Sequence, residues 1–257
     1  MRYKDEVVVI TGSGRGIGKS VAMKLAENGA KVVINDVDEE VAAEVVKEIH
    51  QNGGMAVAAI GSVANPDDAN ALVETALSQF GTVHTLINNA AVTRTAMIDK
   101  MTDEQWDLVV DVGLKGAFNC IRAVAPIFKE RAKANPEAFS NGRIINVTST
   151  AGMTGTIGQI NYGAAKAGVI GLTMSTAREW GRFRIQSNAV AFGVVETRMT
   201  ETIRTEKFAD TYLNKIVLNR FATTEDVVPG ILFLASSDAN YITGHVLNIS
   251  GGYHIGV

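Results

Sequence analysis

Short apolar runs alternate along the chain with amphipathic segments whose apolar residues recur at helical spacing. This alternation predicts strands connected by helices, and hence an α/β fold with a doubly wound parallel sheet and helices on both of its faces. The predicted strands are Val7–Ile10, Lys31–Asn35, Ala56–Ile60, Thr85–Asn88, Arg143–Val147, Gln186–Ala191 and Val246–Ile249.

Several helix starts can be read from capping residues. Asn65 precedes Pro66, which suits the first helical position, and Thr102 has Gln105 three residues later, as in a capping box. The acidic run that begins at Asp38 favours another helix N-terminus. These features are structural and carry no chemistry.

A length of 257 residues and a hydrophobic fraction of 46% suit one α/β domain with a sizeable core, so we expect residues 1–257 to form a single domain. The polar segment 129–142 reads as a helix end and a surface loop. Residues 197–218 are polar and weakly periodic, and we expect them to form a substrate lid.

The first predicted strand ends in the glycine-rich segment Thr11–Gly18, which is followed by an amphipathic helical segment. Glycines allow the backbone to approach a pyrophosphate closely, and the following helix N-terminus attracts its negative charge. This order of elements predicts a Rossmann-type site for a dinucleotide. The expected cofactor contacts in this segment are Gly12, Ser13, Arg15, Gly16, Ile17 and Gly18.

The second predicted strand is followed by Asp36, which indicates the preferred dinucleotide. A carboxylate at this place can accept hydrogen bonds from both ribose hydroxyls and repels a 2′-phosphate. The sequence therefore predicts NAD(H) over NADP(H), although Arg15 stands where it could contact a 2′-phosphate.

Tyr162 and Lys166 stand one helical turn apart, and Ser149 follows a predicted buried strand. A phenol works as an acid or base near neutrality only if its pKa falls by roughly three units, or about 4 kcal/mol. An ammonium about 4 Å away contributes roughly that energy at an effective dielectric constant of about 20. We therefore expect Lys166 to lower the pKa of Tyr162 and Ser149 to hold the substrate oxygen.

With these motifs the chain resembles the classical short-chain dehydrogenase/reductase family from end to end. The resemblance covers the glycine segment, Asn88-Asn89-Ala90-Ala91, the Ser149, Tyr162 and Lys166 positions, and Phe192–Thr197. It is closest to 3-oxoacyl thioester reductases and to hydroxyacyl or secondary-alcohol dehydrogenases. It implies further cofactor contacts at Ser62, Val63, Asn89, Ala90, Tyr162, Lys166, Gly193, Val195 and Thr197, and a homotetramer or homodimer.

The chain departs from the family pattern at several positions. Gly113 stands where the family has a catalytic asparagine that helps to hold a water beside the lysine. A glycine inside a helix costs up to about 1 kcal/mol relative to alanine. Ser62 replaces a frequent aspartate, Ala91 a glycine and Phe192 a proline. These changes affect the proton relay and the cofactor site, but the serine, tyrosine and lysine are kept.

Composition excludes several classes of partner. A net charge of −3 and a pI near 5.8 provide no basic face for nucleic acid or anionic lipid. No apolar stretch approaches about 20 residues and the N-terminus does not resemble a signal peptide, so we expect a cytoplasmic protein without membrane contact. The single cysteine, Cys120, lies in an apolar run and is expected to be inert, and four scattered histidines predict no metal site.

Two functions follow from these observations. The first is an oxidoreductase that transfers a hydride between NAD(H) and a secondary alcohol or ketone, with Tyr162 as the acid or base. Its substrate is an acyl thioester or a free alcohol. The alternative, motivated by Gly113, Ser62 and Phe192, is a poorly active cofactor-binding subunit with a structural or regulatory role.

Overall fold

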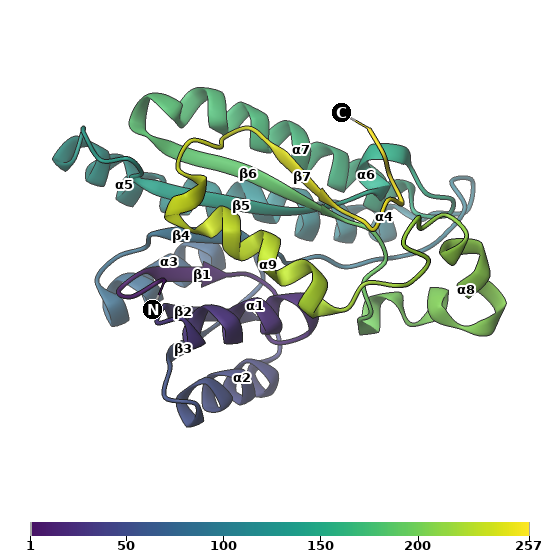
Figure 1. Ribbon diagram of the computed structural model, residues 1–257, viewed down its shortest axis with the longest axis horizontal. Coiled ribbons are helices and arrows are strands. Elements are labelled where there is room, and N and C mark those ends of the chain that lie inside the picture. The colour runs from purple at the N-terminus through teal and green to yellow at the C-terminus, as the bar shows by residue number, and fades with distance from the viewer. Residues whose placement is uncertain (1, 257) are drawn as a thin grey trace.

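The computed structural model describes residues 2–256 and contains one seven-stranded sheet in which every neighbouring pair is parallel (Figure 1). The strand order is β3-β2-β1-β4-β5-β6-β7. This is the doubly wound sheet that the sequence predicts. The strands are β1 (Val7–Ile10), β2 (Lys31–Asp36), β3 (Met55–Ile60), β4 (Thr85–Asn88), β5 (Gly142–Ser149), β6 (Ile185–Phe192) and β7 (Val246–Ile249).

All seven predicted strands are confirmed, but β5 and β6 are longer than their apolar runs suggest. The two strands stay paired up to Ser149 opposite Phe192. Ser149 is thus the last residue of β5 and not part of the loop that follows it.

The helices cover both faces of the sheet. Along β1, Val8 and Ile10 pack with helices on one side, whereas Val7 and Val9 pack on the other. The first side carries α1 (Gly16–Glu27), α2 (Glu39–Gln51) and α9 (Thr224–Ala235), which runs across the front of the sheet in Figure 1. The second carries α3 (Pro66–Phe80), α5 (Gly116–Ala134) and α7 (Ile160–Trp180). The shorter elements are α4 (Asp103–Val110), η1 (Asp111–Lys115), α6 (Ala151–Thr154), η2 (Gly181–Phe183), η3 (Arg198–Thr200), η4 (Thr202–Arg204), α8 (Glu206–Leu213) and η5 (Ser237–Ala239).

The predicted helix caps are present. The Asn65 side chain accepts a hydrogen bond from Asp67 N at 2.9 Å, with Pro66 beginning α3. Thr102 and Gln105 form the reciprocal bonds of a capping box at the start of α4. Asp38 caps α2. The segment predicted to form a lid folds into η3, η4 and α8, at the right of Figure 1.

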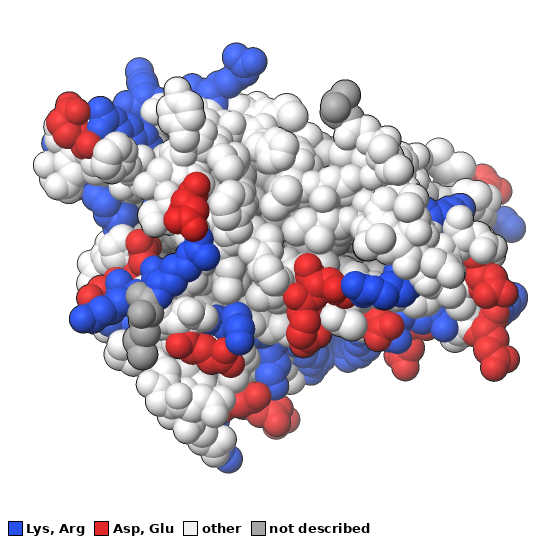
Figure 2. All heavy atoms as spheres, in the orientation of Figure 1, with Lys and Arg blue, Asp and Glu red and all other residues white. Residues whose placement is uncertain are grey.

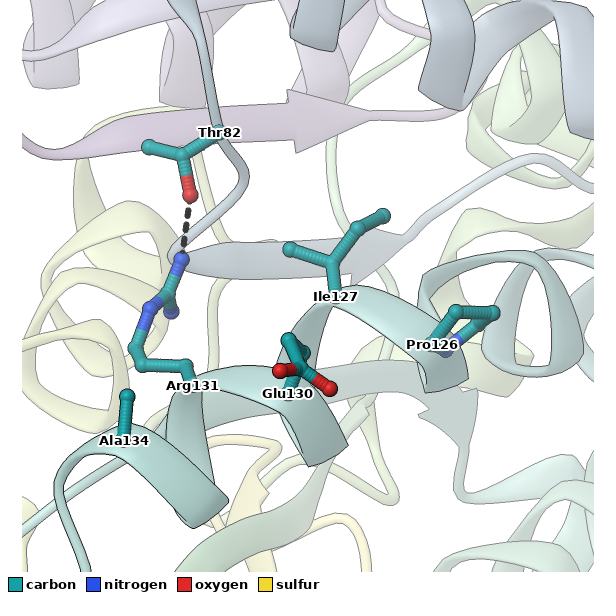
Figure 3. A pocket seen from close by; sticks show the side chains of 6 residues that line it. All are labelled: Thr82, Pro126, Ile127, Glu130, Arg131 and Ala134. Atoms are coloured by element: carbon teal, nitrogen blue, oxygen red, sulfur yellow. Dashed lines mark hydrogen bonds between the residues drawn. The ribbon is translucent and has the colours of Figure 1, made fainter.

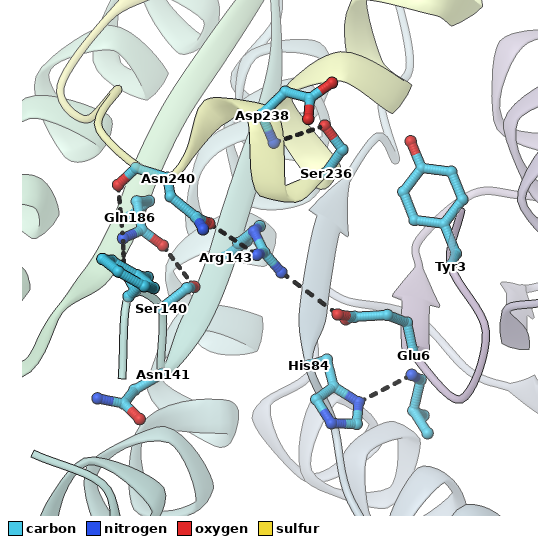
Figure 4. A network of polar contacts seen from close by, with 12 residues as sticks. Tyr3, Glu6, His84, Ser140, Asn141, Arg143, Gln186, Ser236, Asp238 and Asn240 are labelled. Carbon is cyan, nitrogen blue, oxygen red and sulfur yellow. Dashed lines mark hydrogen bonds and ion pairs between the residues drawn. The ribbon is translucent and has the colours of Figure 1, made fainter. Parts of the chain in front are cut away.

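The two ends of the sheet differ in kind. At the amino ends of the strands, the Arg143 side chain lies between Glu6, at 3.6 Å, and Asn240, whose Oδ1 accepts a hydrogen bond at 2.8 Å (Figure 4). In the same network His84 Nδ1 accepts a bond from Val7 N, and burial lowers the pKa of His84. This network ties together chain segments far apart in sequence. All the predicted site residues that follow strands lie at the opposite end, because parallel strands share one carboxyl edge.

Between residues 2 and 256, no helix has both the length and the apolar character needed to span a bilayer.

Candidate active site

The glycine segment after β1 is packed so closely that side chains are excluded. Gly12 has a φ of +59°, and a Cβ there would lie 2.8 Å from Ala90 Cα. A Cβ on Gly18 would lie 2.5 Å from Gly12 O. The resulting turn exposes backbone at the N-terminus of α1, and this cradle fits the pyrophosphate of a dinucleotide.

Asn89 joins this turn to the end of β4. Its Nδ2 donates to Thr11 O at 3.0 Å and to Gly12 O at 2.9 Å. In return, Thr11 Oγ1 accepts bonds from the backbone N–H groups of Asn89 and Ala90, both at 3.0 Å. Asn89 and Ala90 therefore fix the shape of the glycine turn by hydrogen bonds to Thr11 and Gly12. The sequence predicted only a direct contact of these two residues with the cofactor.

Asp36, the last residue of β2, lies against the same loop. Its carboxylate accepts hydrogen bonds from Gly14 N at 3.1 Å and Asp38 N at 3.2 Å. Arg15 forms an exposed ion pair with Asp38 at 2.5 Å, which turns it to the protein rather than leaving it free for a phosphate. Because exposed pairs contribute at most about 1 kcal/mol, this one restrains Arg15 only weakly.

Ser62 and Val63 follow β3 next to Asp36. Asp68 in α3 accepts a hydrogen bond from Ser62 N at 2.8 Å, and Asn119 in α5 donates to Val63 O at 3.0 Å. The Val63 side chain fills the space beside Gly116, where a Cβ would lie 2.5 Å from Val63 Cγ2. Two helices thus fix this loop beside the predicted ribose carboxylate.

The catalytic candidates come from β5 and α7. Ser149 Oγ lies 3.4 Å from Phe192 O, to which it donates, and accepts a bond from Ala151 N at 3.2 Å. Lys166 Nζ donates to Val147 O at 2.7 Å, and Lys166 O accepts from Thr148 Oγ1 at the same distance. Lys166 is therefore bonded through both its side chain and its backbone to β5, with Nζ 5.6 Å from the centre of the Tyr162 ring.

The effect of this arrangement on Tyr162 is opposite to the sequence prediction. Burial raises the pKa of the Tyr162 phenol, and a hydrogen bond with Ser149 offsets part of the increase. Burial also lowers the pKa of the Lys166 ammonium to about 8. The ammonium is directed to the Val147 carbonyl rather than to the phenol oxygen, so desolvation dominates both groups.

The nicotinamide-side segment after β6 closes over the glycine turn. Gly193 packs against Ser250, where a Cβ would lie 3.1 Å from the Ser250 Cα, and Val195 makes a parallel bridge with Ala222. Thr197 Cγ2 would lie 3.5 Å from a Cβ on Gly16. The residues predicted for the two ends of a nicotinamide dinucleotide are thus brought to one edge of the sheet.

Gly113 is buried in η1, a short π-helical stretch between α4 and α5. A Cβ at this position would meet only Ala165 Cβ, at 3.5 Å, which is an ordinary contact. Ala165 precedes Lys166 on α7. The family's asparagine position therefore lies beside the turn of α7 that carries Lys166, and the backbone there has room for a Cβ atom.

Sequence reasoning missed Asn161, which is fully buried next to Tyr162 and hydrogen-bonded to segments far away in sequence. The sequence does show an asparagine directly before Tyr162. It does not show the partners of the asparagine side chain, because these lie far away along the chain.

Other places in the described chain carry less chemistry. A hollow of about 450 Å³ is lined by Thr82, Pro126, Ile127, Glu130, Arg131 and Ala134 (Figure 3). It lies at the amino end of β4, away from Tyr162, and its Arg131 is bonded to Thr82. Residues 2–256 contain no group of three or more histidine, cysteine, aspartate or glutamate side chains able to hold a metal ion.

Comparison with known proteins identifies the family. Residues 12–254 match the family model described as enoyl-(acyl carrier protein) reductase. The chain belongs to the short-chain dehydrogenase/reductase family. It is 41% identical to a 3-oxoacyl-(acyl-carrier-protein) reductase of Thermotoga maritima, over 98% of this chain and 99% of the relative. A reductase of the same name from Synechocystis is 43% identical over 96% of each chain.

Solved structures of short-chain dehydrogenases have the same fold. A gluconate 5-dehydrogenase from Burkholderia cenocepacia, in complex with NADP and tartrate, has a TM-score of 0.92 at 31% identity and covers 100% of this chain and 98% of its own. A short-chain alcohol dehydrogenase from Sinorhizobium meliloti has a TM-score of 0.90 at 34% identity, covering 97% and 96%. The chain is thus an oxidoreductase of this family, whose members bind nicotinamide cofactors.

The buried Lys166 ammonium should make the free energy of unfolding depend on pH. Because the pKa of Lys166 is lowered by folding, the unfolded chain binds a proton there between pH 8 and about 10.4 that the folded chain does not. Wild-type stability should therefore rise with pH relative to that of Lys166→Met, by about 2 kcal/mol between about pH 7.5 and pH 9.5.

Urea unfolding of both proteins at the two pH values measures this difference. Lys133→Met, at an exposed position, is the control and should show no such change. A constant difference between wild type and Lys166→Met would mean that Lys166 titrates as a solvated lysine.

Proposed function

We propose that this protein transfers a hydride between NAD(H) and a secondary alcohol or ketone, and that its substrate is a 3-oxoacyl or 3-hydroxyacyl thioester. The observation that carries the proposal is that Ser149, Tyr162 and Lys166 lie together at the sheet edge that also holds the glycine turn. The thioester is supported by relatives named 3-oxoacyl-(acyl-carrier-protein) reductase that match almost the whole chain.

The proposed mechanism divides the work among these side chains. When bound, the nicotinamide supplies or accepts the hydride. Ser149 donates a hydrogen bond to the substrate oxygen. Tyr162 gives a proton to that oxygen in reduction and takes the proton from the hydroxyl group in oxidation. Lys166 places a positive charge in buried surroundings near the Tyr162 ring, where it stabilises the phenolate more strongly than it would at the surface. The dinucleotide is held by the glycine turn, Asp36 and the segment through Thr197.

Exposed apolar side chains on three segments, the loop after β4, the loop before α7 and residues 197–218, support an acyl substrate: Met97, Ile98, Ile157, Met199 and Phe208. Of the lid cations, Arg204 donates to Thr197 O at 3.2 Å, and Lys207 lies over the Phe208 ring. A fluorescence screen tests the substrate class by following NADH oxidation with 3-oxoacyl thioesters and simple ketones, and NAD+ reduction with secondary alcohols. A preference for simple ketones would contradict the thioester proposal.

The proposed unit is one dinucleotide-binding domain with a lid at residues 197–218, working in the cytoplasm.

Burial raises the pKa of the Cys120 thiol to about 12, so the thiol stays protonated and inert.

Asp36 should select NADH. We expect NADH to bind at least about tenfold more tightly than NADPH, or about 1.4 kcal/mol, because the carboxylate repels a 2′-phosphate. Fluorescence titration of both cofactors measures the ratio, and Asp36→Ala should reduce it. Asp38→Ala is the matched variant, since it releases Arg15 while keeping the ribose carboxylate. Equal affinity or an NADPH preference in the wild type would mean that Arg15 outweighs Asp36.

Tyr162 should be required for the chemical step. Tyr162→Phe should lower turnover by at least about 100-fold, because it removes a positioned acid or base, while cofactor affinity hardly changes. Steady-state rates and NADH titrations measure the two effects. Tyr241→Phe, at a fully exposed position, is the control. Near-normal turnover of Tyr162→Phe would show that another group moves the proton.

Gly113→Asn should raise turnover. The position has room for a Cβ atom beside Ala165, and an amide carried on it would help to hold a water beside Lys166. Gly113→Ala adds the Cβ without an amide and should give no gain, which separates the effect of the amide from that of removing the helical glycine. Rates in light and heavy water decide, since an impaired relay gives the wild type the larger solvent isotope effect. Equal rates and equal isotope effects in all three proteins would mean that residue 113 takes no part in proton transfer.

We also propose assembly into a homotetramer or homodimer. The segments Gly113–Phe128 and Gly163–Ala177 expose Phe118 and Met174, each 45% accessible. Figure 2 shows, in addition, an almost uncharged face over β7 and the neighbouring α7. Light scattering should give a multiple of the 27.3 kDa chain mass at micromolar concentration, and Phe118→Glu should shift the protein toward the monomer. A monomeric wild type would contradict this.

A further inference from the structure

Asn161 is completely buried at the start of α7, and its side-chain amide makes three hydrogen bonds. Nδ2 donates to Arg94 O at 3.0 Å and to Gln105 O at 2.9 Å. Oδ1 accepts from the backbone N–H of Tyr162 at 2.8 Å. Both N–H groups of the amide thus donate to another part of the chain, and the amide oxygen accepts from the backbone of Tyr162.

The two carbonyl groups lie on either side of one loop, Arg94 O in the segment after β4 and Gln105 O in the first turn of α4. The loop between them carries Met97 and Ile98, which are 53% and 70% exposed. The loop is also bonded to the segment before α7, because Ala96 N donates to Gly158 O at 3.0 Å. The Asn161 amide therefore connects the two ends of this segment by hydrogen bonds.

The same amide also completes the first turn of α7. The residue that precedes this helix, Gln159, makes no side-chain capping bond, so the early N–H groups of the helix need other partners. Asn161 Oδ1 supplies one of them to Tyr162 N. A shift of the loop away from Asn161 would leave buried donors without acceptors, and hence the loop and the Tyr162 backbone are constrained to move together.

We propose that Asn161 is a positioning residue that couples the substrate-side loop, residues 94–105, to Tyr162. The phenol takes its reacting position beside Ser149 only when this loop is seated on α7. A substrate that packs on Met97 and Ile98 holds the loop down and thereby holds the proton donor in place. The inference rests on the role proposed above for Tyr162.

Asn161→Asp has the same shape but cannot donate to the two carbonyls, and Asn161→Ser is a small uncharged variant. Both should lower kcat by about 10- to 100-fold, the scale of a misplaced reacting group. The affinity for NADH should stay within about twofold of the wild type. In the oxidative direction, Asn161→Asp should also move the kcat–pH profile to higher pH, because a carboxylate next to Tyr162 disfavours the phenolate.

Asn141 provides the matched control. It is also buried, and its Nδ2 donates to two backbone carbonyls, Asn135 O at 3.3 Å and Phe183 O at 3.0 Å, at the opposite end of the sheet. Asn141→Asp should lower the melting temperature but leave kcat within about twofold and the pH profile in place. If Asn161→Asp and Asn161→Ser behave like Asn141→Asp, the coupling is overturned.

Hydrogen exchange of the wild-type protein tests the coupling without any variant. Peptides that cover residues 94–105 and the first turn of α7 should open with the same free energy and gain protection together when NADH and a substrate bind. Independent opening of the two segments would overturn the proposal. Tyr162→Phe separates this result from the proposed function: if that variant stays active, the tyrosine's role fails even though coupled exchange remains.

Discussion

Every strand in this protein runs in the same direction, and the rest of the structure depends on that constraint. Parallel strands place all their carboxyl ends at one edge, so loops from distant parts of the chain meet there without special design. The chain order reverses between β1 and β4, which are neighbours in the sheet. At this switch the Asn89 amide bonds to Thr11 and Gly12, so protein hydrogen bonds tie the glycine turn to the end of β4.

Burial governs the chemistry at the other half of this edge. Desolvation disfavours the ionised forms of both groups, because it raises the pKa of the Tyr162 phenol and lowers that of the Lys166 ammonium. Burial of Lys166 also increases the interaction of its charge with any other charge that forms nearby. A phenolate and an ammonium would therefore stabilise each other here much more than at the surface. Lys166 is kept in position for this by its bonds to Val147 and Thr148, although these direct its charge to the strand.

Two features of this protein lie around α7. Gly113 stands beside Ala165 in a π-helical stretch and leaves room there for a Cβ atom. Asn161 connects the substrate-side loop to the tyrosine through a single amide. Both features lie beside the first turns of α7, which carry Tyr162 and Lys166.

Local pattern in the sequence was sufficient for the architecture. Alternating periodicity located all seven strands, capping residues marked the starts of α3 and α4, and the spacing of Tyr162 and Lys166 put them on one helix turn. These features depend on neighbours within a few residues, which the sequence displays directly.

The tertiary structure decided what depends on distant neighbours. Ser149 belongs to β5 because Phe192 pairs with it, and Arg15 turns to Asp38. The sequence predicted a lowered pKa for Tyr162 from the charge on Lys166, but desolvation is set by everything that surrounds the phenol and raises it instead. The role of Asn161 was equally hidden, since its acceptors lie 56 and 67 residues away and only folding brings them to one amide.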